Sequence, residues 1–109
     1  REAGTAVEAM VPGVRLVCFG HIGDGNLHFN VSQPVGMDKE AYLAYWHDMN
    51  HCVHSIVMRY NGSFSAEHGI GQLKREELAF FKPPAALDLM RRIKAAFDPA
   101  GIMNPGKVL

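Results

Sequence analysis

The residues best suited to chemistry are histidines and carboxylates beside glycine-rich segments. His21 and His28 flank the turn-forming stretch Gly23-Asp24-Gly25. If the turn joins two strands, both imidazoles can reach one side, where Glu67 from a second glycine-rich segment can join them. Two histidines and one carboxylate, with open coordination positions, commonly hold catalytic zinc or another first-row divalent ion. The spacing of the two histidines is not specific, so the alternative is a turn residue followed by a solvent-facing strand residue.

The second glycine-rich segment, residues 62–71, places Glu67 directly before His68. Adjacent side chains point in different directions, so one can bind a metal while the other faces a substrate. A neutral imidazole near a divalent cation is a suitable general base, because the cation lowers its pKa and that of a bound alcohol. The alternative is a structural turn in which Ser65 caps a helix.

A rival cluster consists of His47, His51 and His54, which share one face of a predicted helix. This face lies almost opposite the apolar stripe of the helix, and no carboxylate or glycine-rich loop reaches it. We therefore expect a solvated polar face here.

The sequence lacks the motifs of several other kinds of binding site and catalytic site. There is no dinucleotide or phosphate-binding glycine motif, and no nucleophile elbow that would activate Ser63 or Ser65. Cys18 and Cys52 are expected to be packing residues. Two cysteines cannot form a disulfide framework, which favours a reducing compartment.

The composition is that of one globular domain. The 109 residues are 48% hydrophobic and 20% charged, and 11 basic residues balance 11 acidic ones. A net charge of zero argues against nucleic acid or an anionic membrane as the main partner. No apolar run approaches the roughly 20 residues of a membrane span, and nothing resembles a signal peptide. Because the chain opens at Arg1 without a methionine, we expect it to be a piece of a longer protein.

The predicted elements give an α+β class. A helix ends near Met10, and strands over 14–19 and 27–31 form an antiparallel hairpin that belongs to a larger sheet. Alternation directs Leu27, Phe29 and Val31 to the core, and His28 and Asn30 to the opposite face.

The remaining sequence predicts helices and an irregular tail. One long helix runs from an N-cap at Asp38 to a stop at Asn61-Gly62. Its buried stripe comprises Tyr42, Tyr45, Trp46, Met49, Val53, Ile56, Val57 and Tyr60. A short helix is expected over 72–79, and another starts at Pro83-Pro84 and stops before Pro99.

Three stretches also resemble a known family in their order and spacing. They are GHIGDGNLHFN at 20–30, GSFSAEHGIG at 62–71 and FDPAGIMNPGK at 97–107. Together they look like the C-terminal domain of the FAD-linked oxidases, which include D-lactate dehydrogenase, D-2-hydroxyglutarate dehydrogenase and the glycolate oxidase flavin subunit. The likeness covers nearly the whole chain from Val14 onward.

The resemblance implies a fold and a set of site residues. The fold would be the C-terminal part of the cap, or substrate, domain of a vanillyl-alcohol-oxidase-type flavoprotein. Residues matching His21, His28 and Glu67 hold a zinc-like ion in relatives that use a metal. Asn30 and His68 match substrate-facing positions, His68 matches the presumed base, and Asn104 is a candidate flavin contact.

The resemblance also implies a reaction for the intact protein. A D-2-hydroxy acid such as lactate, glycolate or 2-hydroxyglutarate is oxidised to the 2-keto acid, with hydride passing to FAD and then to an undisclosed electron acceptor. The FAD-binding domain of such proteins precedes this region, so residues 1–109 are expected to be a C-terminal domain that is inactive alone. The sequence leaves undecided whether the protein forms a homo-oligomer. The expected location is the cytoplasm or, in a eukaryote, the mitochondrion.

Two other classes of function stay open from the residues themselves. One is a structural metal-binding module, which a closed coordination shell would favour. The other is a metal-dependent hydrolase that uses Glu67 and His68 on a metal-bound water, which a flavin contact at Asn104 would exclude.

Overall fold

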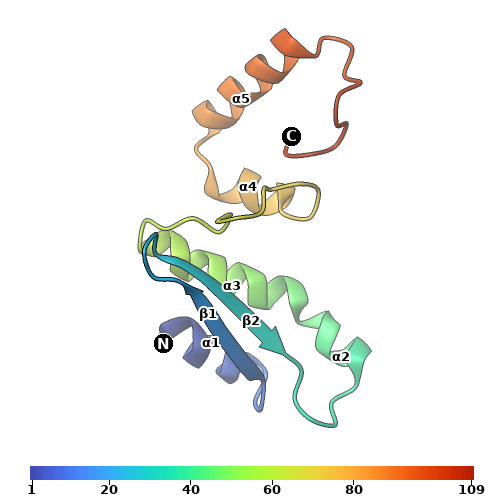
Figure 1. Ribbon diagram of the computed structural model, residues 1–109. Helices are drawn as coiled ribbons and strands as arrows, with labels where there is room; N and C mark the ends of the chain where they lie inside the picture. The colour runs from blue at the N-terminus through green and yellow to red at the C-terminus, as the bar shows by residue number, and fades with distance from the viewer. The chain divides into compact units, whose positions relative to one another are not determined.

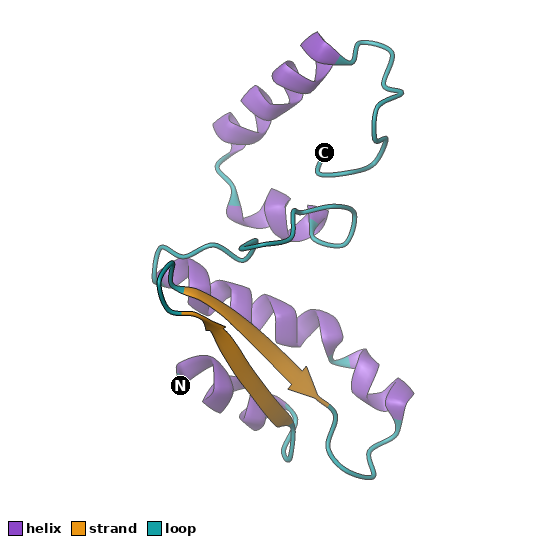
Figure 2. Cartoon of the chain, viewed as in Figure 1, coloured by secondary structure: helices purple, strands orange, loops and turns teal.

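A computed structural model describes all residues 1–109 and shows five helices and one two-stranded sheet (Figures 1 and 2). The predicted α+β class is therefore confirmed. The chain divides into two compact units, Arg1–Ala66 and Glu67–Leu109.

The centre of the first unit is the predicted antiparallel hairpin. Strand β1 (Arg15–His21) pairs with β2 (Asn26–Ser32). At the turn, β1 ends two residues later and β2 begins one residue earlier than predicted. Gly20 faces the backbone of the partner strand so closely that a Cβ atom there would lie 2.0 Å from the carbonyl oxygen of Asn26. The tight end of the hairpin therefore requires glycine at this position.

Three helices complete the first unit: α1 (Glu2–Met10), α2 (Lys39–Ala44) and α3 (Trp46–Arg59). The carboxylate of Asp38 accepts a hydrogen bond from the Ala41 amide at 3.0 Å, which confirms the predicted N-cap. The prediction of one long helix was wrong, because the chain breaks at Tyr45. There the Tyr45 amide donates to the Tyr42 carbonyl at 3.1 Å, a tighter turn than that of an α-helix.

The end of α3 follows the predicted stop. Asn61 has a φ of 55°, in the left-handed region. The amides of Asn61 and Gly62 donate to the carbonyls of Met58 and Val57, each at 3.0 Å. These two bonds form a Schellman motif, which satisfies carbonyl groups that the last turn of a helix leaves without partners.

The core of the first unit lies between one face of the hairpin and the helices. The buried cluster consists of Val7, Val11, Val14, Tyr42 and Met49, and Phe29 and Val31 pack against it. Leu27 was predicted to join them but is 61% exposed. It pairs with Gly20 near the turn, beyond the residues that meet the cluster, so periodicity alone misplaced it.

Two further predictions of burial failed in part. Tyr42 and Met49 of the predicted helical stripe are buried, whereas Tyr60 is 72% exposed and donates a hydrogen bond from its hydroxyl to Glu2 at 2.8 Å. Cys18 was expected to pack but is exposed, as is every other residue of β1.

The second unit contains α4 (Arg75–Phe81), α5 (Pro84–Phe97) and the C-terminal tail. Helix α4 begins at Arg75, later than the predicted Gln72, while α5 matches its predicted start and stop. The buried side chains of this unit are Leu78, Leu87 and Asp98. The amide of Val108 donates to the carbonyl of Gly71 at 2.8 Å, so the tail returns to the segment that precedes α4.

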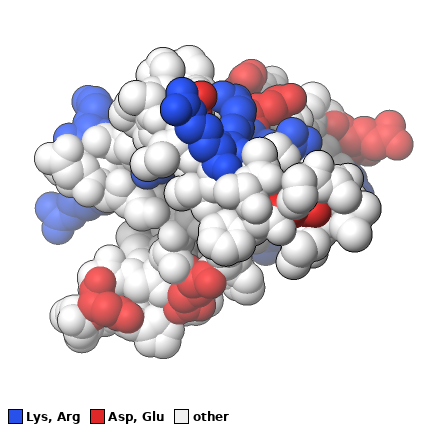
Figure 3. Space-filling view, turned by 90° about the horizontal axis from the view of Figure 1, so that it is seen from above, with Lys and Arg blue, Asp and Glu red and all other residues white.

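The surface agrees with the balanced charge of the sequence. Acidic and basic side chains both occur on the face shown in Figure 3, with large uncharged areas between them. None of the helices combines the length and apolar character needed to cross a membrane.

Candidate metal centre

The hairpin places the predicted site residues on its open face. Residues directly opposite each other in an antiparallel pair point to the same side, and His28 lies opposite Phe19 while Asn30 lies opposite Val17. His21 shares this side with Phe19, because it lies two residues along the same strand. The core-facing residues Phe29 and Val31 occupy the other side, which confirms the predicted orientation of His28 and Asn30.

Glu67 brings a carboxylate to the two histidines. One ligand atom from each of His21, His28 and Glu67 lies within 4.8 Å of the others. Glu67 is bonded to Ala66, the last residue of the first unit.

The donor set fits a divalent ion of the zinc class. Bonds of about 2.0–2.1 Å at a tetrahedral ion put ligand atoms about 3.4 Å apart, so side-chain rotation has to close only part of the distance from 4.8 Å. Imidazole nitrogen suits zinc and other first-row transition ions, and a carboxylate adds a negative oxygen. Three protein ligands would leave coordination positions on such an ion for a substrate or water.

The exposure of the three residues makes the centre accessible. His21 and Glu67 are exposed and His28 is half-buried. A structural zinc site is usually closed by four protein ligands, whereas a catalytic site keeps an open position. The arrangement therefore suits chemistry on a bound small molecule better than a structural role.

The ring of His28 contacts two neighbouring rings. It stacks on Phe19 with centroids 4.7 Å apart and ring planes 9° from parallel. His21 approaches it edge-on, with centroids 6.1 Å apart and an angle of 66°. The imidazole of His28 therefore lies between one phenyl ring and one imidazole ring.

The other predicted site residues are placed individually. Asn30 is exposed on the open face of the hairpin, and His68 is exposed in the loop directly after Glu67. Earlier in the same loop, the backbone amide of Ser65 donates a hydrogen bond to the hydroxyl of Ser63 at 3.2 Å. Ser65 starts no helix, because α4 begins only at Arg75.

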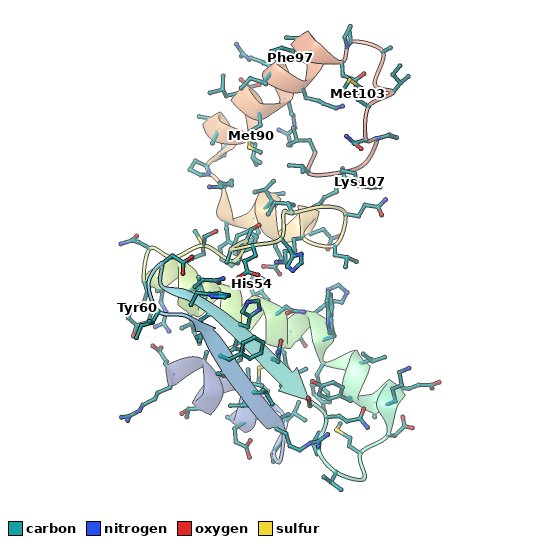
Figure 4. The ribbon with its side chains drawn as sticks, viewed as in Figure 1. His54, Tyr60, Met90, Phe97, Met103 and Lys107 are labelled. Carbon is teal, nitrogen blue, oxygen red and sulfur yellow. The ribbon has the colours of Figure 1, made fainter.

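Asn104 lies on the tail of the second unit, where it is exposed with a φ of 48°. The loop before it is held by Asp98, whose buried carboxylate accepts hydrogen bonds from the amides of Ile102 and Met103, each at 3.0 Å. Lys94 also donates to this carboxylate and to the carbonyl of Met103, and Met103 is labelled on this loop in Figure 4.

The electrostatics of this loop follow from these contacts. The Lys94 ammonium, which donates to Asp98, holds the pKa of that carboxyl below its usual value, and the two backbone amides act in the same direction. Burial acts in the opposite direction but does not prevail. Asp98 is therefore a negative charge that ties the last turn of α5 to the loop carrying Asn104.

The rival histidine cluster, His47, His51 and His54, lies on α3. His47 and His51 are exposed, as predicted for a solvated face. His54 departs from that prediction because it is half-buried, with its ring 5.0 Å from that of Phe64 (Figure 4). Its ring therefore faces an aromatic neighbour from the loop after α3.

Sequence reasoning missed two residues that lie beside the predicted site residues. Phe19 was treated as part of an apolar strand, although its spacing from His21 already put it on the histidine face. Asp98 was treated as the end of a helix, and only its burial identifies it as the anchor of the Asn104 loop.

Comparison with known proteins covers almost the entire chain. The family model described as "FAD linked oxidases, C-terminal domain" matches residues 2–108. D-2-hydroxyglutarate dehydrogenase of Stutzerimonas stutzeri strain A1501 is 46% identical over 108 residues, which is 99% of this chain and 23% of that protein.

A mammal and an archaeon also contain similar proteins. The mitochondrial D-2-hydroxyglutarate dehydrogenase of Bos taurus is 44% identical over 99 residues, or 86% of this chain and 16% of that protein. D-lactate dehydrogenase of Archaeoglobus fulgidus is 38% identical over 97 residues, or 89% and 20%. The chain thus spans less than a quarter of the length of these relatives.

Proposed function

This chain belongs to the family of C-terminal domains of FAD-linked oxidases, and on that basis we propose that it forms the metal- and substrate-binding part of a flavin-dependent dehydrogenase. The reaction is oxidation of a D-2-hydroxy acid, of the lactate, glycolate or 2-hydroxyglutarate type, to the 2-keto acid. The observation that carries this proposal is the convergence of His21, His28 and Glu67 at an accessible place on the hairpin. The names of the similar dehydrogenases support the substrate class.

In this proposal the predicted site residues have different roles. His21, His28 and Glu67 would hold the ion, and Asn104 would contact the flavin, which a domain outside these residues binds. When bound, the ion would polarise the substrate hydroxyl and orient the acid, and the flavin would accept hydride. Asn30, on the same hairpin face, donates an amide hydrogen bond to the substrate carboxylate. His68 takes the hydroxyl proton on an imidazole nitrogen, which must be neutral to accept it.

We also propose that the hairpin continues into a larger antiparallel sheet of a vanillyl-alcohol-oxidase-type cap domain. Strand β1 is exposed along its whole length, and Val17 and Phe19 are 53% and 55% exposed. A two-stranded hairpin is marginal in water without further strands or packing. The similar proteins are more than four times as long as the matched region, which leaves ample chain to cover this strand. The mitochondrial name of the Bos taurus relative supports a location inside the cell, in the cytoplasm or, in a eukaryote, the mitochondrion.

The two alternative classes have less support. A structural zinc module normally encloses its ion with four protein ligands, whereas this cluster supplies three, of which His21 and Glu67 are exposed. A metal-dependent hydrolase does not need the Asn104 tail, and the family to which the chain belongs is flavin-linked.

The test uses the intact protein that carries this chain. We expect about one divalent ion per chain, and His28→Ala should remove most of it, because a three-ligand site depends on each ligand. Metal content by elemental analysis after dialysis measures this directly. His51→Ala is the matched control, since it removes an exposed histidine from α3. Full metal in His28→Ala, or loss in His51→Ala, contradicts the proposed centre.

A further inference from the structure

Phe19 is an aromatic residue that the core does not use. Its side chain is 55% exposed on β1, on the same side of the hairpin as His21. The exposed part of this large apolar ring brings no stability by burial. Its position opposite His28 in the strand register suggests another use.

The geometry of the pair restricts the imidazole of His28. The two rings are nearly parallel, 9° apart, with centroids separated by 4.7 Å. The nitrogen lone pair that binds a metal lies in the plane of an imidazole ring, so stacking on the ring face does not cover it. In this same conformation the ligand atoms of His28, His21 and Glu67 converge within 4.8 Å.

We propose that Phe19 is a positioning residue for the metal centre, which keeps His28 in the rotamer that points its nitrogen at the ion. This inference rests on the proposed function, since it assigns a role within that centre. Without the stack, the imidazole samples other rotamers, and metal binding must select the competent one. The apparent dissociation constant then rises by the inverse of the competent fraction.

The strength of the stack sets the size of the effect. An aromatic pair contributes about 0.5–1.5 kcal/mol beyond its buried area. At 1.4 kcal/mol per tenfold change, loss of the stack should weaken metal affinity roughly 2- to 12-fold. This is far less than the loss expected when a ligand itself is removed, so the two roles are separable by measurement.

The experiment measures Zn²⁺ affinity of the intact protein by competition with a chelator. Phe19→Leu keeps an apolar side chain but removes the ring, and Phe19→Tyr keeps the ring and should retain wild-type affinity. Val17→Ala is the matched control, because Val17 is 53% exposed on the same strand and face but lies opposite Asn30. Its affinity should equal that of the wild type. If Phe19→Leu does not fold by far-UV circular dichroism, Phe19→Met replaces it.

A second measurement reports on the ring of His28 without any metal. In the metal-free wild type, the ring protons of His28 should be shifted upfield in the NMR spectrum by the stacked phenyl ring. Phe19→Leu should remove this shift, whereas Phe19→Tyr should keep it.

The outcomes separate the role of Phe19 from the existence of the centre. If His28→Ala loses the ion while Phe19→Leu keeps wild-type affinity, the positioning role is wrong and the centre stands. The positioning role is also wrong if Val17→Ala weakens binding as much as Phe19→Leu. A wild-type protein that binds no Zn²⁺ overturns both.

Discussion

Tyr42→Phe tests how the strand that carries His28 and Asn30 is anchored to the helices. Tyr42 is a buried member of the core cluster, and its hydroxyl donates a 2.7 Å hydrogen bond to the carbonyl of Val31 on β2. The variant removes one oxygen atom and creates almost no cavity. The loss is therefore that of one well-formed hydrogen bond, about 0.5–1.5 kcal/mol of the free energy of unfolding.

The control for this variant is Tyr60→Phe. Tyr60 also loses a hydroxyl that donates a hydrogen bond, to Glu2 at 2.8 Å, but its side chain is 72% exposed. Water replaces an exposed partner, so the effect should be clearly smaller than that of Tyr42→Phe. Urea denaturation followed by fluorescence suits both variants, because Trp46 is the single tryptophan and lies on α3 of the same unit.

Alkaline pH provides a second measurement on the same pair of proteins. Burial raises the pKa of Tyr42 above its ordinary value of 10.0. A raised pKa means that the stabilisation is complete below the pKa of the unfolded chain and is lost as pH rises through that of the folded protein. The difference in the free energy of unfolding between the wild type and Tyr42→Phe should therefore become smaller above pH 10. Equal effects of the Tyr42 and Tyr60 substitutions, or a gap that widens at alkaline pH, would refute the reasoning.

Two further predictions concern catalysis and the tail. In the intact protein, His68→Ala should lower turnover roughly 10²–10⁴-fold and keep the metal, whereas Glu67→Ala should lose both turnover and metal. Steady-state kinetics together with elemental analysis distinguishes the two variants. If His68→Ala only raises KM, His68 is a substrate-binding residue and not the base. Because the pKa of Asp98 is lowered on folding, its stabilisation is present above the ordinary carboxyl pKa and is lost as pH falls through the folded value. The amides of Ile102 and Met103 should then lose hydrogen-exchange protection at acid pH in the wild type, and at every pH in Asp98→Ala, which removes both acceptor oxygens.

Local sequence signals account for most element boundaries. The Asp38 cap, the Asn61-Gly62 stop and the Pro83-Pro84 start all act within one or two helical turns, where capping and backbone preferences decide the conformation. The hairpin was predictable for the same reason, since a glycine-rich turn separates two apolar stretches. Alternation along β2 then put His28 and Asn30 on the face opposite Phe29.

Burial was less predictable, because it depends on which element covers a residue. Leu27 follows the alternation of β2 but lies beyond the core cluster, and nothing in the local residues marks the break at Tyr45. The exposure of Leu27 depends on where the core cluster lies, and the core is built from segments that are distant in the chain. Periodicity describes a face of an element and contains no information about what that face meets.

By itself, the sequence determined the family, the hairpin and the three residues proposed as ligands. Only the tertiary structure decided that ligand atoms of His21, His28 and Glu67 come within 4.8 Å of one another. It also decided that Phe19 stacks on His28 and that Asp98 holds the loop before Asn104. The physical reason is that residue type and spacing set what a side chain can bind, whereas strand register and chain path set which side chains meet.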